Sequence, residues 1–139
     1  MPWLLNLAYL AAVLVAAPVL LWQRVVRGKR RPGLWKKLTG RLVRRTGDER
    51  LVWFHAVSVG EVLQLEPMIS ECRRLWPSLQ ILVTTTTATG HRLACERFLD
   101  CHVDWFPLDF SWAVDRALRR IRPDLVVLVE LELWPNFIL

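Results

Sequence analysis

Residues 51–61, LVWFHAVSVGE, contain the first unit of a strand–helix pattern that repeats through the rest of this chain. Residues 51–56 form an apolar run of the length of a buried strand, and a helical pattern follows through Leu65, Ile69 and Leu75. The stretch predicts a strand, a short loop and a helix. Pro67 either kinks that helix or marks its true start near Glu66.

The same order of elements recurs downstream. The β-branched run 81–86 leads into a helical stretch at about 91–99, and a weaker strand at 103–106 precedes a helix at 111–121. Residues 125–129 are wholly apolar, as expected of a strand buried on both faces of a parallel sheet. Alternating strands and helices predict an α/β fold with a doubly wound, Rossmann-like parallel sheet.

An uncharged apolar run precedes this domain. Residues 3–22 form a run long enough to cross a bilayer as a helix. Basic residues follow the run, and the small residues of a signal-peptidase cleavage site are missing at its end. We therefore predict an uncleaved membrane anchor over residues 1–23, with the rest of the chain in the cytoplasm. A helix lying in the membrane interface is the alternative, because four alanines make the run only moderately hydrophobic. Either arrangement places the globular part on the cytoplasmic membrane face.

The formal charge of +6 and the pI near 10.0 predict anionic partners. The excess of bases lies in residues 24–49, which predicts a basic juxtamembrane linker that binds anionic lipid headgroups, with a merely solvated charge run as the alternative. A nucleic-acid partner is not expected, because no recognised binding motif accompanies the bases. The 3 cysteines contain no CxxC pair, and no cluster has metal-ligand spacing, so we predict reduced thiols and no metal site.

Ligands of doubly wound sheets gather at the carboxyl ends of the strands, which directs attention to residues 58–61, 84–90 and 130–136. Ser58 and Glu61 fit the S-x-x-E capping box of a helix start. The functional alternative is that Gly60 lets a ligand approach the backbone while Glu61 acts as a general base on an acceptor hydroxyl. The sequence leaves both interpretations open.

The second string, TTTTATG at 84–90, places hydroxyls and backbone donors where a strand turns into a helix, a natural site for a phosphate or a sugar hydroxyl. Strand propensity and a threonine cap explain the same residues without a ligand. Neither a P-loop nor a dinucleotide motif is present. The third string places Glu130 and Glu132 directly after an apolar strand, which favours a functional role for these carboxylates. His55 ends the first strand and can face the same site.

Together, HAVSVGE at 55–61, TTTTATG at 84–90 and ELELWPN at 130–136 resemble the N-terminal domain of 3-deoxy-D-manno-octulosonic acid (Kdo) transferases. That family carries strings of the form HxVSVGE, TTxTxTG and ETELWPN in this order behind a hydrophobic anchor. The resemblance covers nearly the whole chain. Leu131 stands where the family pattern has threonine, which leaves the flanking acids in place.

The resemblance implies an inverting, metal-independent GT-B glycosyltransferase of lipopolysaccharide biosynthesis at the bacterial inner membrane. It implies CMP-Kdo as donor, a lipid A precursor (lipid IVA) as anionic acceptor, and no cofactor. Glu61 would be the general base, and Glu130 or Glu132 a second essential carboxylate. The candidate acceptor-binding residues are His55, Ser58, Gly60, Thr85, Thr86, Thr87, Thr89, Gly90, Trp134 and Asn136.

Residues 50–139 are expected to form an incomplete N-terminal acceptor domain, with the family's C-terminal donor domain absent. A GT-B enzyme works in the cleft between two domains, so we expect the isolated chain to transfer no Kdo. Two alternatives remain open: a different membrane-associated GT-B glycosyltransferase, and a non-catalytic membrane-anchored domain that binds glycolipid.

Overall fold

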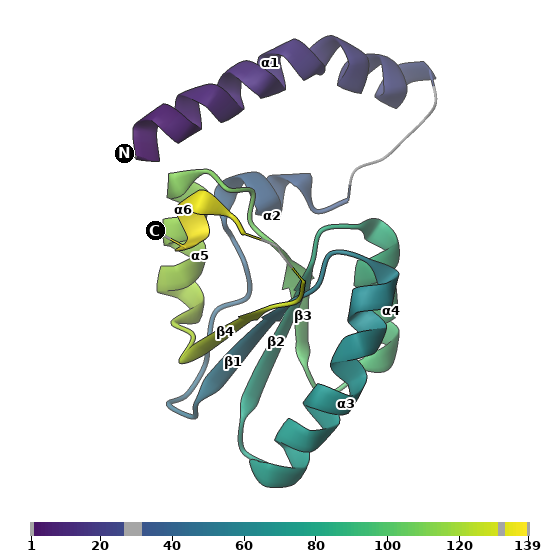
Figure 1. Ribbon diagram of the computed structural model, residues 1–139, viewed down its shortest axis with the longest axis vertical. Helices are drawn as coiled ribbons and strands as arrows, with labels where there is room; N and C mark the ends of the chain where they lie inside the picture. The colour runs from purple at the N-terminus through teal and green to yellow at the C-terminus, as the bar shows by residue number, and fades with distance from the viewer. Residues whose placement is uncertain (1, 27–31, 131–132, 139) are drawn as a thin grey trace.

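The computed structural model describes residues 2–26, 32–130 and 133–138. Helices and strands alternate from β1 onward, which confirms the predicted α/β class (Figure 1). The elements in chain order are α1 (Pro2–Val26), α2 (Leu34–Thr39), β1 (Leu51–His55), α3 (Val59–Leu75), β2 (Gln80–Thr85), α4 (Ala88–Arg97), β3 (His102–Trp105), α5 (Ser111–Ile121), β4 (Leu125–Leu128) and α6 (Pro135–Ile138).

The strands form a parallel sheet with the order β3-β2-β1-β4. Strand β1 lies inside the sheet, where His55 is paired with Thr84 of β2 and with Leu128 of β4. The chain runs outward from β1 to β3 and then returns to the other side of β1, as in a doubly wound sheet. The switch point of such a topology lies between β1 and β4, at the edge of the sheet where the strands end. We call this edge the carboxyl edge.

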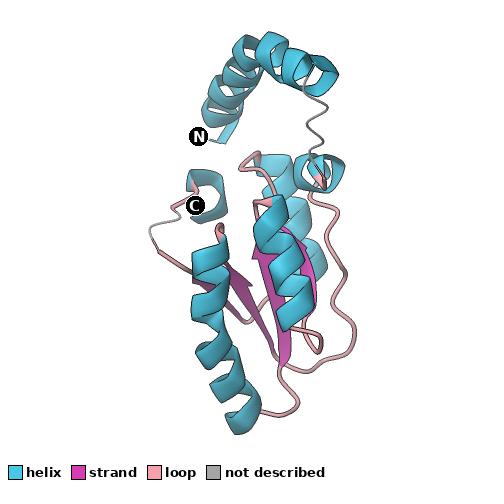
Figure 2. Ribbon diagram, turned by 90° about the vertical axis from the view of Figure 1, so that its right-hand side faces the viewer, coloured by secondary structure: helices cyan, strands magenta, loops and turns pink. Residues whose placement is uncertain are grey.

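The side chains of the strands alternate between two cores. Phe54 and Val83 pack under α3 and α4, whereas Trp53 and Leu82 face α5. Helices therefore cover both faces of the sheet (Figure 2). Because each core is built from β1 and β2 together with a helix on its own side, the two central strands are fixed from both faces.

Two helices begin earlier than the apolar pattern predicts. Helix α3 begins at Val59, because Ser58 caps it, so a start near Glu66 is wrong and Pro67 lies inside the helix. Helix α4 begins at Ala88 rather than near His91, since the Thr87 hydroxyl accepts from the Gly90 amide. In both helices the cap, rather than the first buried apolar residue, marks the start.

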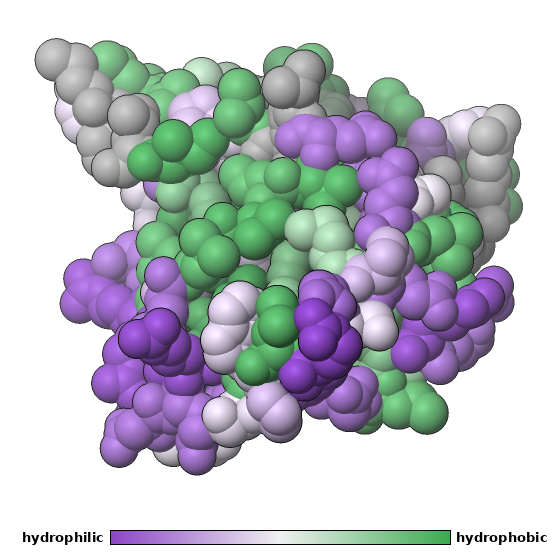
Figure 3. Space-filling model, turned by 60° about the horizontal axis from the view of Figure 1, so that its bottom comes forward, coloured by the Kyte–Doolittle hydropathy of each residue, from purple (hydrophilic) through white to green (hydrophobic). Residues whose placement is uncertain are grey.

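The sequence predicts that β4 is buried on both faces. In the structure, β4 instead forms one edge of the sheet. Leu125 is 55% exposed, and the other residues of β4 are half-buried. On the side of α3, a largely apolar hollow of about 620 Å³ is lined by residues of β1, α3 and β4, including Val52, Phe54 and Val127. Hydrophobic residues form a continuous area bordered by hydrophilic ones on this face (Figure 3).

Helix α2 lies within the segment 24–49, which the sequence predicts as a linker. Gly33 and Gly40 flank it with φ values of 72° and 63°, a conformation that L side chains rarely adopt. A Cβ at Gly40 would lie 1.9 Å from the carbonyl oxygen of Ala113, so α2 ends in close contact with α5. Leu42 is then buried in the core on that side. Much of the basic segment therefore packs against the domain.

Helix α1 lies across the end of the domain at which the strands terminate, beside α2 and α6 (Figure 1). It is the one described helix long and apolar enough to cross a membrane, with a mean hydropathy of 2.3 over Trp3–Gln23. The candidate strings and the apolar helix therefore lie at the same end of the molecule.

Candidate functional site

The three candidate strings meet at the carboxyl edge. The Thr87 hydroxyl donates to the carbonyl oxygen of Val57 at 2.8 Å, which joins the second string to the first. The Val129 amide, just before the third string, donates to the carbonyl oxygen of His55 at 3.0 Å. Residues more than 70 positions apart in the sequence are thus brought to the switch point between β1 and β4.

The capping box predicted at Ser58 and Glu61 is present. The Glu61 amide donates to the Ser58 hydroxyl at 3.3 Å. In return, the Glu61 carboxylate accepts from the amides of Val57 at 2.8 Å and Ser58 at 3.1 Å. Each carboxylate oxygen accepts one of these bonds, and each has a second lone pair. The cap therefore orients the carboxylate at the start of α3 without using its full accepting capacity.

The environment of Glu61 lowers its pKa overall. Burial raises the pKa, because it disfavours the charged form, but the bonds from Ser58 and from the Val57 and Ser58 amides outweigh burial, with a smaller contribution from His55. Glu61 is buried, with 6% of its surface exposed. The carboxylate is consequently ionised at neutral pH, which is the protonation state that a general base requires.

His55 is fully buried at the end of β1. Its Nδ1 lies 3.0 Å from the carbonyl oxygen of Thr84, and the ring stacks on Phe106 with 3.7 Å between ring centroids. A carbonyl can only accept, so Nδ1 carries the hydrogen and Nε2 bears a lone pair. Burial lowers the pKa of His55 to about 4, with smaller opposing contributions from the bond to Thr84 and the charge of Glu61. His55 is therefore a neutral acceptor at this edge.

Several buried polar atoms near the carboxyl edge have no hydrogen-bond partner within residues 2–26, 32–130 and 133–138. They are Nε2 of His55, Oγ1 of Thr85, Oγ1 of Thr86 and Nε1 of Trp134. Buried polar groups in proteins nearly always have a partner, either in the chain or in bound water and ligand. Unsatisfied donors and acceptors of this kind suit the hydroxyl groups of a sugar.

The two glycines of the candidate site differ in what surrounds them. A Cβ at Gly90 would lie 2.8 Å from the Thr87 hydroxyl and 3.2 Å from the carbonyl oxygen of Val57, so packing alone requires a glycine there. A Cβ at Gly60 would meet only the Ser58 hydroxyl, at 3.9 Å. Gly60 is exposed, as is Thr89, the second residue of α4. Internal packing therefore explains Gly90 and leaves Gly60 free to face a ligand.

Glu130 lies just beyond β4 and is exposed. Its φ of 60° is unusual for a residue with a side chain, and such backbone conformations concentrate at functional sites. Strand β4 ends at Leu128, two residues before Glu130. Glu132 and Leu131 lie outside the described residues.

Asp109, which sequence reasoning missed, holds the third string in place. Its buried carboxylate accepts from the amides of Asn136 and Phe137, at 3.0 Å each, at the start of α6. The Asn136 side chain donates back to the carbonyl oxygen of Asp109. Trp134 packs near Phe106, with 6.2 Å between the ring centroids. No local motif around Asp109 signals these contacts, because its partners lie 27 and 28 residues away.

Lys37 is a second residue that the sequence analysis did not single out. It projects from α2 to the second string, where its Nζ donates to the carbonyl oxygen of Thr86 at 2.7 Å. The same Nζ lies 4.3 Å from the centre of the Trp105 ring. Burial lowers the pKa of Lys37. The structure thus brings one cation of the basic segment beside the threonine string.

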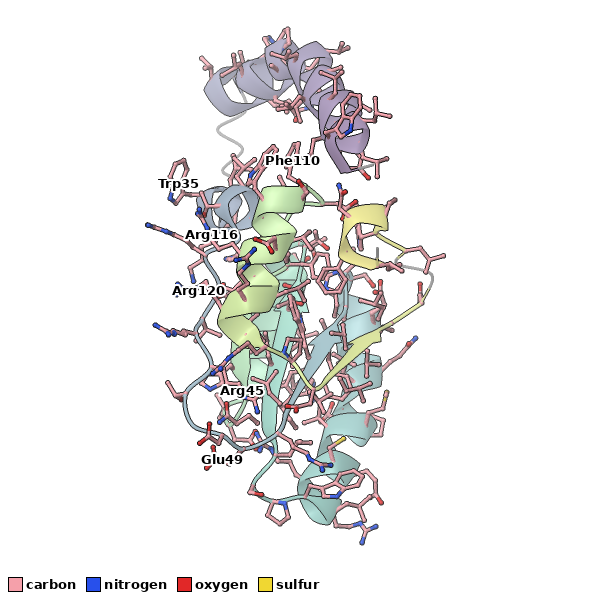
Figure 4. The ribbon with its side chains drawn as sticks, turned by 90° about the vertical axis from the view of Figure 1, so that its left-hand side faces the viewer. Trp35, Arg45, Glu49, Phe110, Arg116 and Arg120 are labelled. Atoms are coloured by element: carbon pink, nitrogen blue, oxygen red, sulfur yellow. The ribbon has the colours of Figure 1, made fainter. Side chains whose placement is uncertain are left out.

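Two further cations of this segment, Arg41 and Arg44, join arginines of α5 around a separate basic hollow of about 530 Å³. Arg116 and Arg120 donate to the carbonyl oxygens of Thr39 and Leu42, which fixes their position (Figure 4). The remaining lining residues are Arg119 and Asp115. Guanidinium groups arranged in this way suit phosphate oxygens. Within the described part of the chain, no cluster of three or more histidine, cysteine or acidic side chains is arranged to hold a metal ion.

Comparison with known sequences identifies the family. The profile of the family described as "3-Deoxy-D-manno-octulosonic-acid transferase (kdotransferase)" matches residues 27–139. The chain belongs to the Kdo transferase family. All three candidate strings lie within the matched range.

Individual members of the family show the same similarity. The chain is 34% identical over 135 residues to the 3-deoxy-D-manno-octulosonic acid transferase of Chlamydia pneumoniae, which covers 96% of this chain and 31% of that protein. It is 36% identical over 121 residues to the probable mitochondrial 3-deoxy-D-manno-octulosonic acid transferase of Arabidopsis thaliana, covering 85% of this chain and 26% of that protein. The chain thus spans about a third or less of the length of these relatives.

Proposed function

We propose that this chain is the acceptor-binding, N-terminal part of a membrane-associated glycosyltransferase that moves Kdo from CMP-Kdo to a lipid A precursor such as lipid IVA. The observation that carries the proposal is the meeting of the three strings at the switch point, with the ionised Glu61 carboxylate fixed at the start of α3. Membership in the Kdo transferase family supplies the class of sugar that is transferred.

Glu61 acts as the general base in the proposed reaction. The acceptor hydroxyl loses its proton to the Glu61 carboxylate while its oxygen forms a bond to the anomeric carbon of Kdo. The bond between that carbon and the phosphate of CMP breaks, and CMP leaves with the bonding electrons. Attack from the face opposite CMP inverts the anomeric centre. Glu130, whose positive φ is of the kind found at functional sites, serves as a second carboxylate in this proposal, and Glu132 is the alternative.

The acceptor is an anionic glycolipid in this proposal, and three features support that class. The unsatisfied polar atoms of His55, Thr85 and Trp134 suit sugar hydroxyls. Lys37 places a cation beside the threonine string, where a phosphate of the lipid can bind. The basic hollow on α5 adds attraction for the anionic surface of the cytoplasmic leaflet. No metal ion or cofactor takes part in the proposed reaction.

The test is Kdo transfer by an enzyme in which residues 1–139 replace the matching part of the Chlamydia pneumoniae relative. We expect this enzyme to transfer Kdo from CMP-Kdo to lipid IVA. Glu61→Gln keeps the shape of the side chain but removes the base, so turnover should fall by roughly 10²–10⁴. The melting temperature should change little, because loss of a cap costs only about 0.5–2 kcal/mol.

Ser58→Ala is the matched control, because it weakens the same cap while leaving the carboxylate in place. It should lower the melting temperature at least as much as Glu61→Gln, with a much smaller loss of turnover. If the loss of turnover in both variants simply followed their loss of stability, Glu61 would act only as a helix cap. Transfer to another lipid-linked sugar, but not to lipid IVA, would identify a different GT-B enzyme. Binding of lipid IVA without transfer would favour a non-catalytic glycolipid-binding domain.

A further inference from the structure

Helix α1 contacts the domain through polar side chains near its N-terminus. Asn6 accepts from the Ser111 amide at 3.0 Å and donates to the Ser111 hydroxyl at 2.6 Å. One turn later, the Tyr9 hydroxyl donates to the Asp109 carboxylate at 2.9 Å, and its ring packs edge-on against Phe110, with 5.9 Å between centroids. These contacts, which we call the α1 latch, join α1 to the start of α5 and the turn before it.

The α1 latch also reaches the third candidate string. The Asp109 carboxylate that accepts from Tyr9 also accepts from the amides of Asn136 and Phe137. The Asn136 side chain lies 3.5 Å from the Asn6 side-chain oxygen. The position of α1 is therefore tied to the element that carries Trp134 and Asn136 at the carboxyl edge.

This contact set conflicts with a bilayer-spanning α1. Tyr9 lies 17 residues before Val26, the end of the helix, so it would sit about 25 Å along the helix axis from the cytoplasmic end. A hydrocarbon core is about 30 Å thick, so Tyr9 and Asn6 would lie deep in the bilayer or near its far side. Asp109 belongs to the soluble domain and cannot follow them. Spanning would also leave the Asn6 amide without its partners in hydrocarbon, which is costly.

The outward face of α1 is apolar. Leu7, Leu14, Val15 and Val25 are 61–81% exposed, whereas Asn6 and Tyr9 are half-buried. Trp3 and Trp22, side chains that favour the membrane–water interface, lie near the two ends of the helix. A helix with polar contacts on one side and exposed aliphatic side chains on the other fits the plane of that interface.

We propose that α1 lies in the plane of the cytoplasmic membrane interface, held to the domain by the α1 latch, with its exposed aliphatic face in the lipid. The carboxyl edge then faces the membrane, and a glycolipid reaches the candidate site without leaving the leaflet. That last consequence rests on the proposed function. The position of α1 does not, because it is measured without any transfer reaction.

The test is cross-linking of the full chain in vesicles of phosphatidylcholine and phosphatidylglycerol. Cys72, Cys95 and Cys101 are replaced by serine, and Asn6→Cys is combined with Ser111→Cys. A short bifunctional thiol reagent should join the pair both in detergent and in vesicles, because the two side chains are in contact. The matched control, Leu14→Cys with Ser111→Cys, carries its first thiol on the exposed side of α1 and should not cross-link. Cross-linking in detergent that disappears in vesicles would overturn the proposal, as would its absence in both.

A second measurement keeps the native cysteines. In the Trp3→Cys variant, a membrane-impermeant thiol reagent is added outside vesicles whose exposed Cys95 shows that the domain lies outside. We expect residue 3 to react from the same side as Cys95, and lysing the vesicles to leave its labelling unchanged. Labelling of residue 3 only after lysis would show that α1 spans the bilayer. Normal cross-linking together with absent Kdo transfer would overturn the proposed function while leaving the position of α1 intact.

Discussion

In the proposed reaction, the Glu61 side chain is both a helix cap and the general base. The amides of Val57 and Ser58 hold the two carboxylate oxygens, and one lone pair on each oxygen stays available. The same bonds lower the pKa, which keeps the carboxylate ionised but makes it a weaker base. The cap therefore contributes positioning rather than basicity to the proposed reaction.

His55 should make the fold sensitive to acid. Its pKa is about 4 in the folded chain, against 6.5 for an ordinary histidine, because burial disfavours the charged ring. The unfolded chain therefore binds the proton first as pH falls. The contribution of His55 is complete above pH 6.5 and is lost as pH falls toward 4, with a total of about 3 kcal/mol. Free energies of unfolding of the native chain and of His55→Asn, measured across this range, should differ in slope. Parallel pH profiles would contradict the neutral, buried histidine.

Gly60 and Gly90 form a matched pair for testing ligand approach. Gly60→Ala should leave the free energy of unfolding unchanged or raise it by up to about 1 kcal/mol, since alanine favours helix and the added Cβ meets no close atom. The melting temperature should follow in the same direction. In the enzyme that combines residues 1–139 with the rest of the Chlamydia pneumoniae relative, Gly60→Ala should raise the KM for lipid IVA. The added methyl group would keep the acceptor away from the backbone at this position. Gly90→Ala should instead lower the melting temperature, since its Cβ meets the Thr87 hydroxyl at 2.8 Å. An unchanged KM in Gly60→Ala would mean that no ligand contacts this position.

Among the elements, those with a clear apolar period were predictable from the sequence. Helix α5 has the bounds that its pattern predicts, and β1 and β2 lie within one residue of theirs, because these elements bury a regular set of side chains. Helix α2 has six residues, none of them buried, so it carries no such signal. For β4, the apolar run identifies a strand but not its neighbours, and its edge position follows from the pairing of distant segments.

The candidate site was predictable to a similar degree. Capping boxes and strand ends are local patterns, so Ser58, Glu61 and Thr87 appear where the sequence places them. Asp109 and Lys37 act through partners 27–28 and 49 residues away, and no local pattern records such a contact. Conversely, the sequence draws attention to Gly90 as a ligand contact, whereas packing against Val57 explains that residue.

Asp109 should stabilise the start of helix α6. Asp109→Asn replaces one acceptor oxygen with an NH₂ group that faces the amides of Asn136 or Phe137, so a buried donor loses its partner. We expect a loss of about 1–3 kcal/mol of stability and faster hydrogen exchange at these two amides. Asp115→Asn is the control, because Asp115 is exposed and pairs with Arg119 on the surface of α5, and a surface ion pair of this kind is worth about 0–1 kcal/mol. Equal effects of the two substitutions would contradict the anchoring role of Asp109.

For the molecule as a whole, one end of the sheet combines the candidate strings, helix α6 and the apolar helix α1 (Figure 1). The apolar hollow lies on the α3 side of the sheet, where it is lined by residues of β1, α3 and β4. The surface that we propose for the lipid acceptor is thus separate from the apolar face that α3 and β4 leave open. The chain covers 31% of the Chlamydia pneumoniae relative. Under the proposed function, CMP-Kdo binds to a part of the enzyme outside residues 1–139.

This assignment predicts that residues 1–139 alone transfer no Kdo. The chain should bind lipid IVA vesicles but leave CMP-Kdo unchanged, because catalysis needs the donor carbon held next to the acceptor hydroxyl at Glu61. Mixing it with the separately produced remainder of the Chlamydia pneumoniae relative should restore donor-dependent transfer, measured as Kdo incorporated into lipid. The same mixture made with Glu61→Gln should transfer no Kdo. This control shows whether the restored transfer depends on residues 1–139 or comes from the added part alone. Transfer by residues 1–139 without the added part would place a donor site within this chain and overturn the division between acceptor and donor halves.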